Sequence, residues 1–308
     1  MKFAGIIAEY DPFHNGHAWQ LAQAKALGAE RVAVAMSCSL VQRGALPLLP
    51  EAVRTRSALT CGADLVFALP APCACAGAEA FARAGVALLA AAGCDGLVFG
   101  AETPDAALLM EAAELLDSSS YRAALKAQLA GGARSFAAAR QAAAAQLASD
   151  ERVAALLDKP NNNLAVEYCR AIRSLAPRME AYPLPRQGAN HGEALHSAHG
   201  QFASASALRK LWAEGGADAV APYVPEAVFP LYQEAYAAGQ YTDFSAAGRC
   251  ELALLRSACR GKAPFADIRG VSEGLEHRLE AAVRTSTTYD ELLDALTTVR
   301  YPRARMRR

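Results

Sequence analysis

The sequence has no excess charge of either sign, because 31 Lys and Arg residues balance 31 Asp and Glu residues among its 308 positions. Its bulk charge therefore identifies neither a polyanion nor a polycation as a partner. Long apolar runs are also missing: the apolar stretches are rich in alanine and broken by charges or glycine, which excludes a membrane-spanning helix. The first residues lead directly into a short apolar run that ends before Glu9, so we expect no signal peptide and no membrane partner.

Cysteine occurs at eight positions, but no CxxC pair has a matching second half. Cys73 and Cys75 lie two residues apart without a histidine near them in the sequence, which is a poor spacing for a zinc site. Several of the others lie in apolar runs, where cysteine behaves as a small hydrophobic residue. We therefore expect reduced, structural cysteines, no metal-ligating residues among them, and a cytoplasmic protein.

The sequence does contain a regular alternation of short apolar runs with helical patterns. Apolar runs bounded by turn residues predict strands over 3–8, 31–36, 64–69, 96–99 and 179–184. Helical periodicity predicts helices over 17–27, 51–61, 78–92, 164–175 and, with a break at Gly131-Gly132, over 105–157. Strands that alternate with helices of this length predict an α/β fold with a parallel sheet and helices on both faces.

The remainder of the chain is first polar and then helical. Residues 187–201 are typical of a polar loop, and Ser204 begins a helix in which Trp212 is expected to be buried. Amphipathic patterns then predict helices over 225–238, 246–258, 273–284 and 289–298, and His277 is expected to face solvent. We expect a catalytic domain over 1–215 and a smaller helical domain over 216–308.

A cluster of basic residues lies at the end of the sequence. Its members are Arg300, Arg303, Arg305, Arg307 and Arg308. A local concentration of guanidinium groups can bind the phosphates of a nucleic acid. Taken alone, the cluster fits a solvated basic end equally well.

The most distinctive segment has the sequence EYDPFHNGH and runs from Glu9 to His17, where the first strand gives way to the first helix. Ligands of open α/β sheets bind beyond the carboxyl ends of the strands, and a helix N-terminus at that edge attracts phosphate. His14 and His17 can both face such a pocket and stabilise charge on phosphoryl oxygens as pyrophosphate leaves. Gly16 removes a side chain that would block the nucleotide. An isolated HxxH pair more often caps a helix or faces solvent, but the strand–turn–helix context favours a phosphate site.

The same segment resembles the signature of the HxGH nucleotidyltransferase superfamily, and the run from Gly5 to His17 is similar to the tRNA(Met) cytidine acetate ligase family of bacteria. Matching motifs follow in order along almost the whole chain: VQRG at 41–44, GADLV at 62–66, FGAE at 99–102, KPNN at 159–162, SASALR at 204–209, EGLE at 273–276 and RYPR at 300–303. The resemblance implies a Rossmann-like nucleotidyltransferase sheet followed by a smaller helical domain. It also implies an enzyme that activates acetate with ATP and acetylates N4 of the wobble cytidine of elongator tRNA(Met).

Site residues can be carried over from the resemblance by position, with His14 and His17 as the catalytic pair. Mg²⁺ is expected to accompany ATP, and Glu9 or Asp11 is its candidate contact, although no dedicated carboxylate cage is visible. In an enzyme that acts on tRNA, the five C-terminal arginines become the candidate tRNA contacts. The implied ATP contacts are Ile7, Ala8, Glu9, Tyr10, Asp11, Pro12, Phe13, His14, Asn15, Gly16, His17, Ala18, Trp19, Gln20, Gly100, Asn161, Arg186, Ser204, Ser206 and Arg209.

The chain departs from the family pattern at positions that bear on activity. Glu51 and Ala52 stand where the family usually has a Lys-Trp pair, while Arg54 is retained. The family also continues beyond the position of Arg308, so the resemblance implies either a sequence that is cut short in the helical domain or a shortened relative. Two alternatives therefore stay open: another HxGH nucleotidyltransferase that acts on a small phosphorylated metabolite, or a catalytically weakened tRNA-binding relative.

Overall fold

The computed structural model describes residues 1–131, 135–185, 202–260, 265–268, 271, 274–299 and 301–308. Two candidate site residues, Arg186 and Arg300, and the predicted loop over 187–201 lie outside the described residues. In the part of the chain that is described, no helix is both long and apolar enough to cross a membrane.

Five parallel strands form one sheet in the order β3-β2-β1-β4-β5. They are β1 (Phe3–Ala8), β2 (Arg31–Ser37), β3 (Leu65–Leu69), β4 (Gly96–Ala101) and β5 (Glu180–Pro185). The predicted parallel α/β sheet is thus confirmed, with differences only at the strand ends. The strand order reverses between β1 and β4, and this reversal creates a crevice at the carboxyl ends of the strands where ligands of such sheets bind.

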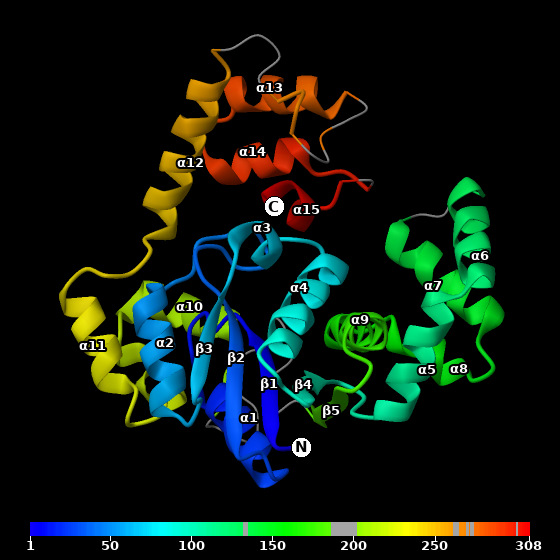
Figure 1. Ribbon diagram of the computed structural model, residues 1–308. Coiled ribbons are helices and arrows are strands. Elements are labelled where there is room, and N and C mark those ends of the chain that lie inside the picture. Colours follow the sequence, from blue (N-terminus) through cyan, green and yellow to red (C-terminus); the bar gives the residue numbers. More distant parts are fainter. Residues whose placement is uncertain (132–134, 186–201, 261–264, 269–270, 272–273, 300) are drawn as a thin grey trace. The chain divides into compact units, whose positions relative to one another are not determined.

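One face of the sheet is covered by α4 (Ala78–Ala91), α5 (Ala106–Asp117) and α9 (Pro160–Leu175), as Figure 1 shows. Leu97 and Phe99 of β4 are buried in the core between these helices and the sheet. A short helix, α3 (Ala71–Ala74), links β3 to α4.

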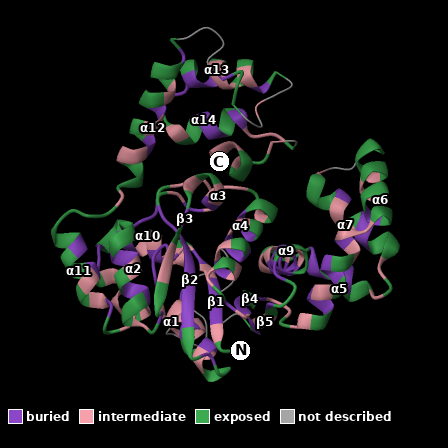
Figure 2. Cartoon of the chain, in the orientation of Figure 1, coloured by how far each residue is buried: buried purple, intermediate pink, exposed green. Residues whose placement is uncertain are grey.

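The opposite face is covered by α1 (Asn15–Ala26), α2 (Glu51–Thr60) and α10 (Ala205–Gly215). Ile6 of β1 and Trp212 of α10 are buried in this second core, which confirms the predicted burial of the tryptophan. Figure 2 shows the central strands buried between the two helical layers. Because both faces of these strands are covered, their sequences are almost continuously apolar.

The residues that the structure describes between 105 and 157 form four separate helices, where a single break was predicted. After α5 come α6 (Ser119–Ala130), α7 (Phe136–Leu147) and α8 (Glu151–Leu156). Each of the last three begins at a side chain that accepts a backbone N–H: Ser118 from Tyr121, Ser135 from Ala138 and Asp150 from Arg152. Alanine favours helix throughout this region, so the capping residues decide where each helix starts.

The sheet and its helices belong to a compact unit that comprises Met1–Gln42 and Pro47–Tyr241. Beyond α10 it contains η1 (Asp218–Tyr223) and α11 (Phe229–Ala237). Tyr232 of α11 is fully buried, and its hydroxyl donates a hydrogen bond to the Phe13 carbonyl at 2.7 Å. The unit therefore extends beyond the boundary expected at residue 215, because an amphipathic pattern does not reveal which core the apolar face joins.

The second compact unit comprises Arg43–Leu46 and Thr242–Arg308. Gly44, in the VQRG motif, has a φ of +72°, and a Cβ there would lie 2.5 Å from the backbone oxygen of Arg307. Only glycine fits this position without movement of the backbone around it. The helices of the unit are α12 (Phe244–Ala258), α13 (Leu275–Thr285), α14 (Tyr289–Leu296) and α15 (Arg303–Arg307).

A buried guanidinium holds together the carboxyl ends of β1 and β2. Arg54 of α2 is 0% exposed, and burial lowers its pKa, an effect that the neighbouring Asp11 carboxylate opposes. Nη1 donates to the carbonyls of Glu9 at 2.8 Å and Ser37 at 2.6 Å. The remaining bonds run from Nε to Leu49 O at 3.0 Å and from Nη2 to Cys38 O. The retained arginine therefore acts on the backbone of the loops that follow β1 and β2.

We expect Arg54→Met to lower the free energy of unfolding by about 3–5 kcal/mol, because buried carbonyls would lose a charged donor. Arg54→Lys should recover little, since one ammonium cannot reach acceptors arranged for a planar fork. Urea unfolding followed by circular dichroism measures both changes. Arg56→Met on the same helix is the matched control, because Arg56 is 60% exposed, and we expect a change within about 0.5 kcal/mol. An Arg54→Met effect no larger than that of Arg56→Met would contradict the role of the clamp.

Candidate active site

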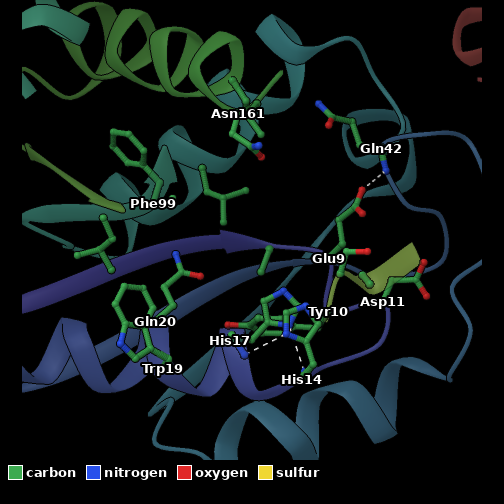
Figure 3. Close-up of a pocket in the computed structure, with 18 of the residues that line it drawn as sticks. Glu9, Tyr10, Asp11, His14, His17, Trp19, Gln20, Gln42, Phe99 and Asn161 are labelled. Carbon is green, nitrogen blue, oxygen red and sulfur yellow. Dashed lines mark hydrogen bonds between the residues drawn. The ribbon is translucent and has the colours of Figure 1, made fainter. Parts of the chain in front are cut away.

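A cavity of about 320 Å³ lies at the carboxyl end of β1, within the first compact unit. Its wall comes from the β1–α1 segment, the ends of β4 and β5, and the first turns of α9 and α10. Figure 3 draws lining side chains as sticks and labels ten of them. The residues of the wall are Ile7, Ala8, Glu9, Tyr10, Asp11, His14, Gly16, His17, Trp19, Gln20, Gln42, Phe81, Phe99, Gly100, Asn161, Leu164, Tyr168, Leu184, Pro185, Ala203, Ser204 and Ala205.

His14 and His17 line this cavity and also cap α1. His14 Nδ1 accepts the backbone N–H of Gly16 at 3.0 Å, and His17 Nδ1 accepts that of His14 at 3.3 Å. The two rings stack with their centroids 3.8 Å apart (Figure 3). A Cβ on Gly16 would lie 2.9 Å from His14 Cε1, so the glycine makes room for the imidazole itself. The two histidines therefore both cap α1 and line the cavity.

The capping bonds determine which nitrogen of each ring carries a proton. An imidazole nitrogen that accepts a hydrogen bond has no proton, so each neutral ring is protonated at Nε2. Two Nε2–H groups on stacked rings form a pair of donors of the kind that stabilises charge developing on phosphoryl oxygens.

The loop between β1 and α1 is anchored from outside the segment. Asp11 is 1% exposed; its Oδ1 accepts the N–H of Leu48 at 2.6 Å, and Oδ2 lies 3.3 Å from Arg209 Nη1. Arg209 also donates to the Asp11 carbonyl at 2.6 Å. The Glu9 carboxylate accepts the N–H of Gln42 at 2.6 Å (Figure 3). Both acidic side chains on this wall therefore organise the loop.

The start of α10 approaches the cavity through Ser204, which caps this helix by accepting the N–H of Ala207 at 3.3 Å. The hydroxyl of Ser206 lies 3.0 Å from that of Ser204. Helices α1 and α10 thus both begin at the cavity, and their N-termini favour a bound anion. The described wall contains no Lys or Arg, so its positive potential comes from these helix ends.

Helix α9 begins at Pro160, earlier than the predicted start at Leu164, because Glu102 supplies acceptors for its first N–H groups. Glu102 Oε1 accepts from Asn161 N at 3.2 Å and from Asn161 Nδ2 at 2.6 Å, and Oε2 accepts from Asn162 N at 2.6 Å. Burial raises the pKa of Glu102, but the bonds from the two asparagines outweigh it and leave the pKa below its usual value. The start of α9 therefore carries an ionised carboxylate, unlike the starts of α1 and α10.

An apolar surface follows Asn161 along α9. Asn161, Leu164 and Tyr168 are spaced for one face of the helix, and all three line the cavity. Tyr168 also packs on Phe99 of β4, with ring centroids 5.4 Å apart. Gln20 faces the same part of the site and donates to the Val98 carbonyl at 3.1 Å. This part of the cavity suits a flat, largely apolar group such as a nucleobase.

Most of the predicted ATP contacts line the cavity, and the other described ones lie outside its lining. Among the described residues, Pro12, Phe13, Asn15, Ala18, Ser206 and Arg209 do not line the cavity. Phe13 is buried in the core, and Arg209 is bound to Asp11. No group of three or more His, Cys, Asp or Glu side chains in the described chain is arranged to hold a metal ion.

Sequence reasoning missed several residues of the site. Glu102 was noticed only as part of a matching motif, and its acidic side chain just after a strand was the available indication. Phe81, Leu164 and Tyr168 gave no indication, because apolar residues at helical spacing look the same whether they face a core or a cavity.

The predicted tRNA contacts that the structure describes all lie in the second unit, and their surroundings differ. Arg303 is paired with Asp290 and Asp294 of α14. The Arg305 guanidinium lies 5.0 Å from the centroid of the Tyr301 ring. Arg308 is exposed. The end of the chain therefore combines an ion-paired arginine with arginines near the surface.

Comparisons with known proteins agree with this geometry. A family model described as HIGH Nucleotidyl Transferase matches residues 1–308. The tRNA(Met) cytidine acetate ligase of Syntrophotalea carbinolica is 36% identical over 311 residues, which cover all of this chain and 73% of the relative. The ligase of Acetivibrio thermocellus is 33% identical and is covered over 75% of its length.

A solved structure leads to the same group. Thermotoga maritima TmcAL bound with alpha-thio ATP superposes with a TM-score of 0.88 at 29% identity, over all of this chain and 73% of that one. The apo structure of the same protein gives a TM-score of 0.91. The resemblance inferred from the motifs is confirmed: the chain belongs to the HIGH nucleotidyl transferases and, among them, to the tRNA(Met) cytidine acetate ligase family.

Proposed function

We propose that this protein activates acetate with ATP and transfers the acetyl group to N4 of the wobble cytidine of elongator tRNA(Met). The observation that carries the proposal is the pair of stacked imidazoles, each accepting through Nδ1, at a helix start inside the cavity. The names of the relatives and the ATP analogue in the Thermotoga maritima structure support it. ATP and tRNA are cytoplasmic substrates, and we place the reaction there.

The first step forms acetyl-adenylate. An acetate oxygen attacks the α-phosphorus of ATP, the bond from that phosphorus to the bridging oxygen breaks, and pyrophosphate leaves. Charge builds up on phosphoryl oxygens in this step, and the Nε2–H groups of His14 and His17 supply donors for it. The N-termini of α1 and α10 lower the energy of the same charge.

The second step transfers the acetyl group to the tRNA. The cytidine N4 amine attacks the acetyl carbonyl carbon, a C–N bond forms, AMP leaves with the electron pair of the broken C–O bond, and the amine loses a proton. No covalent enzyme nucleophile is needed, so the protein acts by positioning and by stabilising charge.

Mg²⁺ would accompany the triphosphate. This ion usually binds one or two carboxylates together with substrate phosphates, and it keeps several waters. Glu9 and Asp11 are the acidic residues of the described wall, and both already accept a backbone N–H, Glu9 from Gln42 and Asp11 from Leu48. Glu9 would be the carboxylate to hold the ion, because Asp11 also pairs with Arg209. The ion would neutralise phosphate charge in a wall whose described residues include no lysine or arginine.

Removal of either imidazole should abolish most of the pyrophosphate release that depends on acetate and ATP. We expect His14→Asn and His17→Ala each to lower kcat by roughly 100- to 1,000-fold, the usual cost of losing one donor to a developing charge. Asparagine retains an acceptor that can cap α1, so the first variant separates chemistry from helix stability. A coupled pyrophosphate assay without tRNA gives the rates.

Two comparisons complete this test. His277→Ala should leave the rate unchanged, because that side chain is 84% exposed in the second unit. Near-normal turnover in both His14→Asn and His17→Ala would dismiss the site assignment. ATP binding without any turnover in the unaltered chain would favour a catalytically weakened tRNA-binding protein, for which Glu51 in place of lysine is the best argument.

We also propose that the C-terminal arginines contact tRNA. Arg305→Ala and Arg308→Ala should weaken tRNA binding and reduce the slope of log K against log salt by about 1 for each lost phosphate contact. Adenylate formation without tRNA should not change. Filter binding at several salt concentrations measures the slope, with Arg31→Ala, at the opposite end of β2 from the cavity, as a charge-matched control. Unaltered tRNA affinity would mean that these arginines are merely solvated.

A further inference from the structure

The amide of Asn161 can be oriented in only one way. Its Nδ2 lies 2.6 Å from Glu102 Oε1, and the carboxylate also accepts the N–H groups of Asn161 and Asn162. A carboxylate offers acceptors alone. The flipped amide would place its oxygen against another oxygen at hydrogen-bond distance, which is repulsive. The orientation therefore follows from the chemistry of Glu102, where an isolated asparagine would leave it ambiguous.

The fixed amide has a consequence for the cavity. With Nδ2 bound to Glu102, Oδ1 is the atom of this cavity-lining amide that is left to accept a hydrogen bond from a bound molecule. Asn161 lies across the cavity from His14 and His17 (Figure 3), and the apolar side chains of Leu164 and Tyr168 continue its face of α9. The phosphate donors and the apolar surface are thus on different parts of the wall, which matches the two ends of a nucleotide.

We propose that Glu102 is a positioning residue that fixes Asn161 as a hydrogen-bond acceptor and so makes the cavity select 6-aminopurine over 6-oxopurine nucleotides. The inference rests on the proposed use of ATP. An acceptor in this place receives the exocyclic N–H of adenine, whereas the O6 atom of guanine or hypoxanthine meets a second acceptor. Sites that hydrogen-bond a substrate group discriminate strongly, because a mismatched ligand leaves buried polar atoms unpaired. The low pKa of Glu102 keeps its carboxylate ionised at neutral pH.

Direct binding tests the inference without relying on turnover. The dissociation constants of ATP and inosine triphosphate would be measured by calorimetry for the unaltered chain, Glu102→Gln and Thr103→Val. We expect the unaltered chain to bind ATP roughly 10- to 100-fold more tightly than inosine triphosphate, the range of one or two hydrogen bonds. In Glu102→Gln the ratio should fall by roughly 10-fold, because the glutamine NH₂ can donate to a flipped Asn161.

Thr103→Val is the matched control. It removes the hydroxyl that accepts from Asn162 Nδ2 at 3.1 Å, so it loosens the same junction of loop and helix while leaving Glu102 and Asn161 in place. We expect its ratio to equal that of the unaltered chain, and an equal fall in this variant would mean that the effect is structural. Asn161→Ala is the second variant, and it should also lose the preference. Circular dichroism confirms that each variant is folded.

Several outcomes overturn the inference. An unaltered chain that binds both nucleotides equally, or a Glu102→Gln variant that keeps the full preference, contradicts it. If neither Glu102→Gln nor Asn161→Ala folds, purine riboside triphosphate, which lacks the 6-amino group, replaces the variants: binding as tight as that of ATP contradicts the inference. ATP binding with the expected preference but no pyrophosphate release would contradict the proposed function and leave this inference standing.

Discussion

The site depends first on one buried charge. The Arg54 guanidinium binds the carbonyls of Glu9, Ser37, Cys38 and Leu49, so it ties the ends of β1 and β2 to each other and to the start of α2. Strand ends at a sheet edge have carbonyls that the ladder does not satisfy, and they would otherwise require water. The buried Arg54 guanidinium supplies these hydrogen bonds in place of water and so fixes the path of the chain as it leaves β1. The histidine segment begins directly beyond this point, so its geometry depends on a residue that does not line the cavity.

Helix ends divide the cavity by charge. At α1 and α10 the caps are a neutral imidazole and a serine hydroxyl, which leave the positive end of each helix dipole uncompensated. At α9 the same position is held by the Glu102 carboxylate, which cancels that dipole. The cavity therefore has a region that attracts anions and a region that is neutral and apolar. Glu51, which stands where the family usually has a lysine, begins α2 and does not line the described wall of the cavity. Its presence leaves the helix ends and the imidazoles of the wall in place.

Much of the fold could be predicted because burial on both faces makes β1, β2 and β4 nearly continuous apolar runs, and each is followed by turn residues. That His14 and His17 face a cavity could be predicted because the pair follows directly after a strand and begins a helix. The start of α9 could not, since Pro160 looks like a break in a helical pattern when it is the first residue of the helix. That the compact unit of the sheet continues to Tyr241 could not be read from the sequence, for another reason. Tyr232 joins the sheet's core through a contact with Phe13 that is 219 positions distant in sequence, and no local pattern encodes it.

Arg209 lies in a matching motif, but in the structure its guanidinium contacts the protein itself. An arginine on the first turns of a helix at a phosphate cavity suggests a phosphate contact, yet its guanidinium donates to the carbonyl and carboxylate of Asp11. The pair therefore links α10 to the β1–α1 loop, which is remote from it in sequence. Asp11 in turn receives Leu48 N–H from the segment before α2, the helix that carries Arg54. Two guanidinium groups therefore bind the loop before His14 and His17: Arg54 at the Glu9 carbonyl and Arg209 at Asp11. The path of the chain that leads to the imidazoles is thus fixed by two arginines that do not line the cavity.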